Sequence, residues 1–155
     1  MSADARDVFQ AFKNHLDSMN FRYDANESEL VIRLTVHGDD LPQPTIIRVM
    51  GDREVVQILS PIPCKMPEDK RVDGAIAVSV ANYGMINGSF DYDMEDGEIR
   101  FRVAMSYRGI DLNDDLIKYI LGIVFFTTDK YNDRFFMVAK GLMTLEQFID
   151  KEKEN

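Results

Sequence analysis

The sequence predicts a single α+β domain in which helices pack on an antiparallel sheet. Apolar residues recur with two periods, the 3.6-residue period of helices and the two-residue period of strands. The segments follow in the order helix, three strands, helix, two strands and long helix, which is typical of α+β domains. The length of 155 residues suffices for one domain, residues 1–155, with frayed ends expected at 1–3 and 152–155.

The first half of the chain is expected to hold one helix and three main strands. A helix is predicted from about residue 4 to residue 19, because apolar residues recur there at helical spacing. These residues are Val8, Phe9, Phe12, Leu16 and Met19. The next segment, NFRYDANESE, breaks the helical pattern, and a short strand is expected in it at 21–23. LVIRLTVH, residues 30–37, alternates apolar and polar side chains as a half-buried strand does.

Two further strands, TIIRVM and EVVQILS, follow the loop GDDLPQP. Gly51 and Asp52 between the two strands predict a tight hairpin. Apolar residues near this turn fall on both faces, which indicates a central strand that is covered on both sides. The prolines of PIPCKMPEDKR are expected to end this half of the sheet, because proline cannot donate to a ladder.

The second half is expected to alternate between helix and strand. The predicted elements are a helix at 68–83, strands at 86–94 and 98–107, a long helix at 114–140 and a short helix at 145–151. The first of these helices is expected to bury a stripe of Val72, Ile76, Val80 and Tyr83. Asn113 or Asp114, and later Thr144, are the expected N-caps.

Between the last two strands, acidic residues crowd around one glycine in FDYDMEDGEIRFRV, residues 90–103. A calcium-binding EF-hand loop needs oxygen ligands at its first, third and fifth positions, glycine at the sixth and glutamate at the twelfth. Counted from Asp91, the glycine stands one place late at Gly97, and the twelfth position holds Arg102, which repels a cation. Spacing and charge therefore exclude this kind of metal site, and no cofactor is expected.

A β-hairpin explains the same residues if Asp96 and Gly97 form a two-residue type I′ turn. The predicted facing pairs are Met94–Ile99, Tyr92–Phe101 and Phe90–Val103 on the apolar side, and Asp93–Arg100 and Asp91–Arg102 on the polar side. Opposite charges that face each other across a ladder stabilise it by about 0.2–1 kcal/mol per pair. The acidic residues are therefore predicted to be structural, because carboxylates held ionised by arginine suit acid catalysis poorly.

The sequence shows no assembled active site. His37 stands beside two aspartates but lacks the further histidine or cysteine that usually closes a metal site. Cys64 stands beside Lys65 but lacks a partner histidine to activate it. We expect a solvated strand end for His37, a half-buried position for Cys64, and a protein that is not an enzyme.

The composition excludes several classes of partner. A net charge of −9 would be repelled by nucleic acid and by anionic membranes. The longest apolar run, ILGIVFF, is far shorter than the roughly 20 residues of a membrane span. A single cysteine and the lack of an apolar leader favour a reducing cytoplasm as the location.

The long helix is apolar around most of its circumference from Leu116 to Phe126. Helices of this kind are buried, so a second subunit or a partner segment is expected to cover the side turned away from the sheet. The predicted interface residues are Ile117, Tyr119, Phe125, Phe126 and Phe136. Alternatively, the last short helix folds back and covers them through Leu145, Phe148 and Ile149.

Four segments carry a family resemblance. The first two are ILSPIPCKMPEDKR and the helix after it, which ends in NYG. The other two are the hairpin from Gly88 to Arg102 and the long helix that closes with KGLMTLEQFI. Residues 54–149 thereby resemble the YbjN-like family of bacterial proteins, whereas the N-terminal third agrees only in its order of elements. The resemblance implies a fold similar to type III secretion chaperones, which are small, acidic, often dimeric and bind extended segments of other proteins. It supplies no catalytic residues.

Residues and resemblance together predict a non-enzymatic, cytoplasmic protein-binding or chaperone-like module. It is expected to bind a partner segment or itself, as a homodimer, through apolar surface around the long helix and the sheet. Acidic rims would favour basic partners. The alternative is a regulator of the sensory-transduction type, with a small-ligand pocket between the sheet and the helices.

Overall fold

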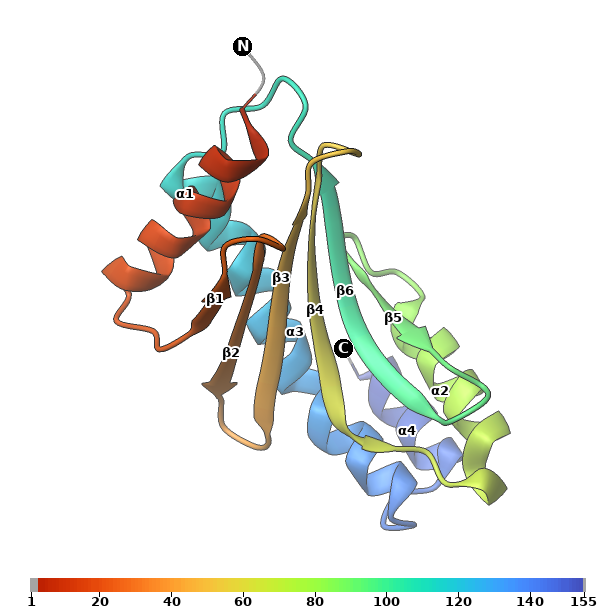
Figure 1. The fold of residues 1–155 in the computed structure, drawn as a ribbon. Coiled ribbons are helices and arrows are strands. Elements are labelled where there is room, and N and C mark those ends of the chain that lie inside the picture. The colour runs from red at the N-terminus through yellow and green to blue at the C-terminus, as the bar shows by residue number, and fades with distance from the viewer. Residues whose placement is uncertain (1–2, 155) are drawn as a thin grey trace.

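The computed structural model describes residues 3–154 as one twisted sheet backed by helices (Figure 1). Within these residues, six antiparallel strands follow in the order β1-β2-β3-β4-β6-β5. The strands are β1 (Asp24–Asn26), β2 (Val31–His37), β3 (Pro42–Met50), β4 (Val55–Lys65), β5 (Ser89–Tyr92) and β6 (Glu98–Ser106). The helices are α1 (Ala5–Ser18), a 3-10 turn η1 (Glu68–Lys70), α2 (Arg71–Asn82), α3 (Asp114–Ala139) and α4 (Leu145–Lys153). The predicted α+β class is confirmed.

The core lies between the sheet and the helices. In Figure 1, α3 runs behind the central strands, with α1 at one end and α2 and α4 at the other. Fully buried side chains from both layers fill the space between them, including Phe12, Leu16, Ile32, Ile47, Ile58, Phe101, Val124 and Phe135. No helix within residues 3–154 lies on the front face of the sheet, which corrects the expectation that a central strand is covered on both sides.

Helix α4 extends into the end of the chain that is expected to be frayed. Residues 1–2 and 155, part of the ends expected to be frayed, lie outside the described residues. Glu152, also expected to be frayed, belongs to the last turn of α4. Its carboxylate accepts hydrogen bonds from Tyr131 (2.7 Å) and Arg134 (2.7 Å), which fasten α4 to α3.

The prolines do not end β4 as predicted. β4 continues through Pro61 to Lys65, and its pairing with β6 shifts between these two residues. β3 likewise begins early, at Pro42. At Pro44 the β3–β4 pairing has stopped, and Ser60 Oγ donates a hydrogen bond to the Pro44 carbonyl oxygen (2.9 Å). A bulge and a side-chain hydrogen bond thus replace ladder bonds that proline cannot make.

The buried face of α2 also differs from the prediction. Val72 and Tyr83, assigned to the buried stripe, are 65% and 93% exposed. The buried positions carry mostly small side chains, at Gly74, Ala77, Val78 and Ala81. A Cβ on Gly74 would lie 2.6 Å from the Tyr92 hydroxyl, so α2 approaches β5 more closely than a larger residue would allow.

The acidic hairpin has a longer turn than the predicted type I′ turn, and its register is shifted by two residues. Asp93 N–H donates to the Glu98 carbonyl oxygen (3.0 Å), and Gly97 N–H donates to the Asp93 carbonyl oxygen (2.8 Å), closing a loop over residues 94–97. The side chains of Asp93 and Asp96 each accept a backbone N–H two residues ahead, an Asx turn that favours this loop.

The observed facing pairs are Ser89–Arg102, Phe90–Phe101, Asp91–Arg100 and Tyr92–Ile99. The predicted pairs Asp93–Arg100 and Asp91–Arg102 are therefore wrong as facing pairs. A shift by two residues leaves every side chain on its predicted face, because strand side chains alternate with period two. The apolar residues still face the core and Asp91 still lies among arginines.

Candidate functional site

Asp91 on the open face of the sheet binds two arginines. Arg102 donates to both Asp91 carboxylate oxygens (2.9 and 3.0 Å), and Arg100 donates to one of them (3.2 Å). Burial raises the pKa of the Asp91 carboxyl, but hydrogen bonds from Arg102 and Arg100 outweigh that effect and hold the pKa below its ordinary value. A carboxyl that stays ionised in this way is a structural ion pair and a poor general acid.

Replacing Asp91 by asparagine is expected to lower the free energy of unfolding by about 1 kcal/mol at neutral pH, since the ion pair is partly exposed. The Asp91 pKa is depressed in the folded chain, so this stability is fully present above the unfolded pKa. It is lost as the pH falls through the lower folded pKa. Urea unfolding of both proteins at neutral and increasingly acidic pH measures the difference. A difference that persists or grows in acid would contradict the ion-pair account.

The candidates for chemistry lie apart from one another. His37 is exposed at the end of β2. Cys64 is half-buried near the end of β4, where burial raises the pKa of its thiol and Lys140 offsets only part of that rise. Among residues 3–154, no group of three or more His, Cys, Asp and Glu side chains converges as a metal site.

His15 is a buried polar residue of α1. Its Nδ1 lies 2.7 Å from a carboxylate oxygen of Asp114 in the first turn of α3. The contact joins residues 99 positions apart and docks α1 on α3. Periodicity within α1 carries no signal for such a partner.

The five predicted interface residues of α3 have three different environments. Ile117 is 1% exposed and belongs to the core, so its assignment to an interface is wrong. Phe125 is half-buried against Phe21, with ring centroids 5.9 Å apart, and Phe136 is half-buried beside Lys140. Tyr119 and Phe126 are the members that remain open, at 59% and 75% exposed.

Tyr119 and Phe126 belong to a stripe on the outer side of α3. We define the α3 seam as Tyr119, Gly122, Ile123 and Phe126. Spacings of three and four residues place these side chains on one face of the helix. With Asp115 and Lys118 at the N-terminal end, they line an open hollow of about 510 Å³.

Two features of the seam were not recognised from the sequence. A Cβ on Gly122 would meet no heavy atom within 4 Å, so the middle of the seam is open to close approach. Asn87 donates a hydrogen bond to the Tyr119 hydroxyl (3.1 Å) and ties the loop before β5 to the seam. Ile86 in that loop is 95% exposed and adds apolar surface beside it.

Helix α4 covers the other half of α3. Phe148 is fully buried and stacks on Phe135, with ring centroids 5.3 Å apart. The predicted fold-back of the last helix therefore exists, but it buries the C-terminal half of α3. The α3 seam lies in the N-terminal half and stays exposed.

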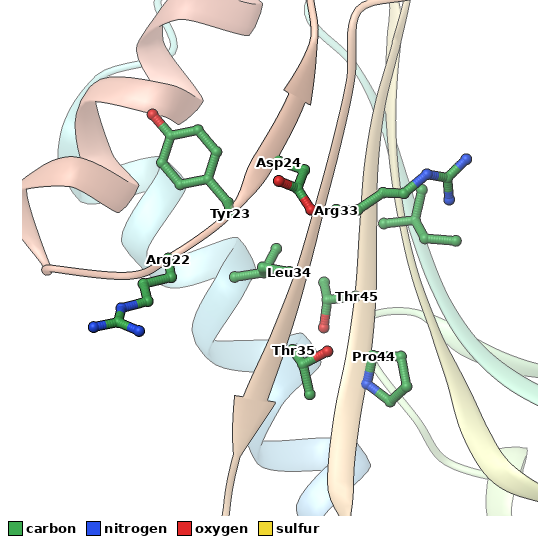
Figure 2. Close-up of a pocket in the computed structure, with 9 residues that line it drawn as sticks. Arg22, Tyr23, Asp24, Arg33, Leu34, Thr35, Pro44 and Thr45 are labelled. Carbon is green, nitrogen blue, oxygen red and sulfur yellow. The ribbon is translucent and has the colours of Figure 1, made fainter.

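A second hollow, of about 410 Å³, opens between the chain before β1 and strands β2 and β3 (Figure 2). Figure 2 shows the Arg33 side chain reaching across β3, whereas the guanidinium of Arg22 points away on the other side. Leu34, Thr35, Pro44 and Thr45 form much of its wall. The hollow is a surface depression and has no catalytic constellation.

Comparison with known proteins identifies a family. The YbjN family model, described as "Putative bacterial sensory transduction regulator", matches residues 10–137. A crystal structure of YbjN from E. coli, described as a putative transcription regulator, is similar in fold with a TM-score of 0.61. The similarity covers 79% of this chain and 87% of that one at 9% sequence identity, so it concerns the fold alone. No curated protein matches the chain. None of the helices in residues 3–154 is long and apolar enough to span a membrane.

Proposed function

This chain belongs to the YbjN family, and from that premise we propose that it is a non-enzymatic regulatory module that binds protein through the α3 seam. The observation that carries the proposal is the exposure of Phe126 and Tyr119 on a helix whose opposite side, with Ile117, Ile120 and Val124, is buried. Aromatic residues on one exposed stripe are typical of protein interfaces. A cytoplasmic location and chaperone-like binding of extended segments are parts of the same proposal.

The first partner that we propose for the α3 seam is a second copy of the chain. In an antiparallel pair with a two-fold axis between Gly122 and Ile123, Tyr119 of each copy faces Phe126 of the other. The same register brings Asp115 opposite Lys130, so the charges at the ends of the seam are complementary. Gly122 allows the two helix backbones to approach closely at the crossing point.

The small-ligand alternative has no comparable support. Large fully buried side chains such as Ile47, Phe101 and Phe135 fill the space between the sheet and the helices. The two hollows described above lie on the surface.

Sedimentation equilibrium of the wild type and a Phe126→Asp variant tests the homodimer. We expect the wild type to be a dimer and Phe126→Asp a monomer, because a buried unpaired carboxylate would have to lose its hydration in the seam. Leu142→Asp is the matched control, since Leu142 is 68% exposed but lies beyond the end of α3. A monomeric wild type, or a Phe126→Asp protein that still dimerises, would overturn the proposal.

A further inference from the structure

The open face of the sheet carries two arginines that have no ion-pair partner among the described residues, 3–154. Arg33 on β2 and Arg48 on β3 are both exposed. Among the hydrogen bonds and ion pairs of residues 3–154, neither guanidinium has a partner. Three acids lie nearby. Asp24 faces Arg33 across the β1–β2 ladder, and Glu29 and Asp52 line the same hollow as the two arginines.

The pairing of the strands places these arginines close together. Arg33 faces Ile46, and Arg48 faces Val31, so the two arginines are diagonal neighbours on the same side of the β2–β3 ladder. Diagonal neighbours lie roughly 7–8 Å apart. Both side chains line one surface hollow of about 500 Å³.

Below the arginines lies an apolar floor that belongs to no helix interface. Val31 and Leu59 are only 6% and 5% exposed, although they point to the face that no described helix covers. Ile46, between them in the sheet, is half-buried. Neighbouring long side chains must shelter this floor, and Figure 2 shows Arg33 stretched across β3 in that way. The Arg33 side chain thus lies over apolar surface, which strengthens its attraction for a carboxylate.

The same face shows how the chain itself binds a carboxylate. Arg100 and Arg102 hold Asp91 through three hydrogen bonds of 2.9–3.2 Å. On the β5–β6 side the arginines therefore have their acid within the chain. On the β2–β3 side Asp24 faces Arg33, and Glu29 and Asp52 line the same hollow as the two arginines, but among residues 3–154 none of these acids forms an ion pair with either guanidinium.

We propose that Arg33 and Arg48 bind the carboxylates of an acidic, extended segment of a partner protein. Acidic residues two apart in an extended chain lie roughly 7 Å apart on one side, which matches the spacing of the two arginines. Bidentate arginine–carboxylate pairs give this contact its strength and geometry. The chain as a whole has a net charge of −9, which would repel an acidic segment. The attraction for such a segment therefore comes from the two arginines at this one place on the surface.

This inference goes beyond the proposed function, because it concerns the opposite side of the molecule from the α3 seam. It also differs from the expectation of basic partners, which rested on the overall acidity of the chain. A protein that fails to dimerise can still bind an acidic segment, so the two proposals fail separately.

The test measures binding of the protein, residues 1–155, to a fluorescent peptide by fluorescence anisotropy. The core of the peptide is Glu-Val-Glu-Val-Glu. The peptide with glutamine in place of glutamate is the control ligand. Arg33→Gln with Arg48→Gln removes both guanidinium groups but keeps most of each side chain. Arg6→Gln with Arg53→Gln removes the same charge from two other exposed positions, which form no ion pair within residues 3–154.

We expect the wild type and the Arg6/Arg53 variant to bind the acidic peptide within twofold of each other, with affinity that falls as salt rises. The Arg33/Arg48 variant should bind at least tenfold more weakly, and the glutamine peptide should not bind. In ¹⁵N spectra the acidic peptide should shift amides of β2 and β3. Absence of wild-type binding, or equal loss in both double variants, would overturn the proposal. Displacement of the peptide by a short single-stranded oligonucleotide at comparable concentration would also overturn it, because the site would then be selective for phosphate.

Discussion

Phe135→Ala is expected to lower the free energy of unfolding by about 3–5 kcal/mol, a large part of the stability of a domain of this size. Phe135 is fully buried at the centre of an aromatic cluster. Its ring centroid lies 5.0 Å from that of Phe90 and 5.3 Å from that of Phe148, so it joins β5, α3 and α4. Removing the ring loses these contacts and leaves a cavity that the surrounding elements cannot close.

Phe126→Ala on the same helix is the matched control for this prediction. Phe126 is 75% exposed, and its truncation should change stability by less than about 0.5 kcal/mol in the monomer. Urea unfolding at low protein concentration, where any dimer has dissociated, compares the two variants. Equal destabilisation by both would mean that the assignment of buried and exposed faces of α3 is wrong.

Gly97→Ala is expected to cost at least about 2 kcal/mol, because two independent effects add at this position. Gly97 has a φ of +79°, a left-handed conformation that alanine adopts only with strain. A Cβ there would also lie 2.2 Å from the backbone oxygen of Met66, so the turn would have to move away. That movement would weaken the hydrogen bond from Met66 N–H to the Gly97 carbonyl oxygen (2.9 Å).

Gly84→Ala separates the two effects. Gly84 has a similar φ of +83°, but a Cβ there would meet no heavy atom within 4 Å. Its replacement should cost only the backbone strain of about 1 kcal/mol. Thermal or urea unfolding of the two variants gives the difference, and a Gly84→Ala protein as unstable as Gly97→Ala would exclude the clash with Met66 as a cause.

Local sequence signals were sufficient for the elements of this fold but not for their contacts. Asn113 was expected as an N-cap, and its side chain does accept the Leu116 N–H (2.9 Å). Thr144 likewise forms a capping box with Gln147. Caps and hydrophobic periods act over a few residues, so the chain itself contains all the information that they need.

The errors arose where a distant segment decides the local structure. Met66 contacts the loop at Gly97, so the turn of the acidic hairpin depends on a residue far away in the sequence. Ile117 is buried because α3 rotates as a whole to place its apolar side on the sheet, and a helix that is apolar all round does not reveal that rotation. Arg33 and Arg48 are neighbours because of the register between β2 and β3, which the sequence of either strand alone does not reveal.

The most direct test of the central claim, that the α3 seam is where this protein binds another copy, is a disulfide cross-link at its centre. Gly122→Cys in a Cys64→Ser background puts a single thiol beside the proposed two-fold axis. Mild oxidation should give a disulfide-linked dimer on a non-reducing gel, whereas Gln10→Cys in the same background, at an exposed position of α1, should stay monomeric. Cross-linking of the Gly122→Cys protein no faster than that of the Gln10→Cys control would contradict the account.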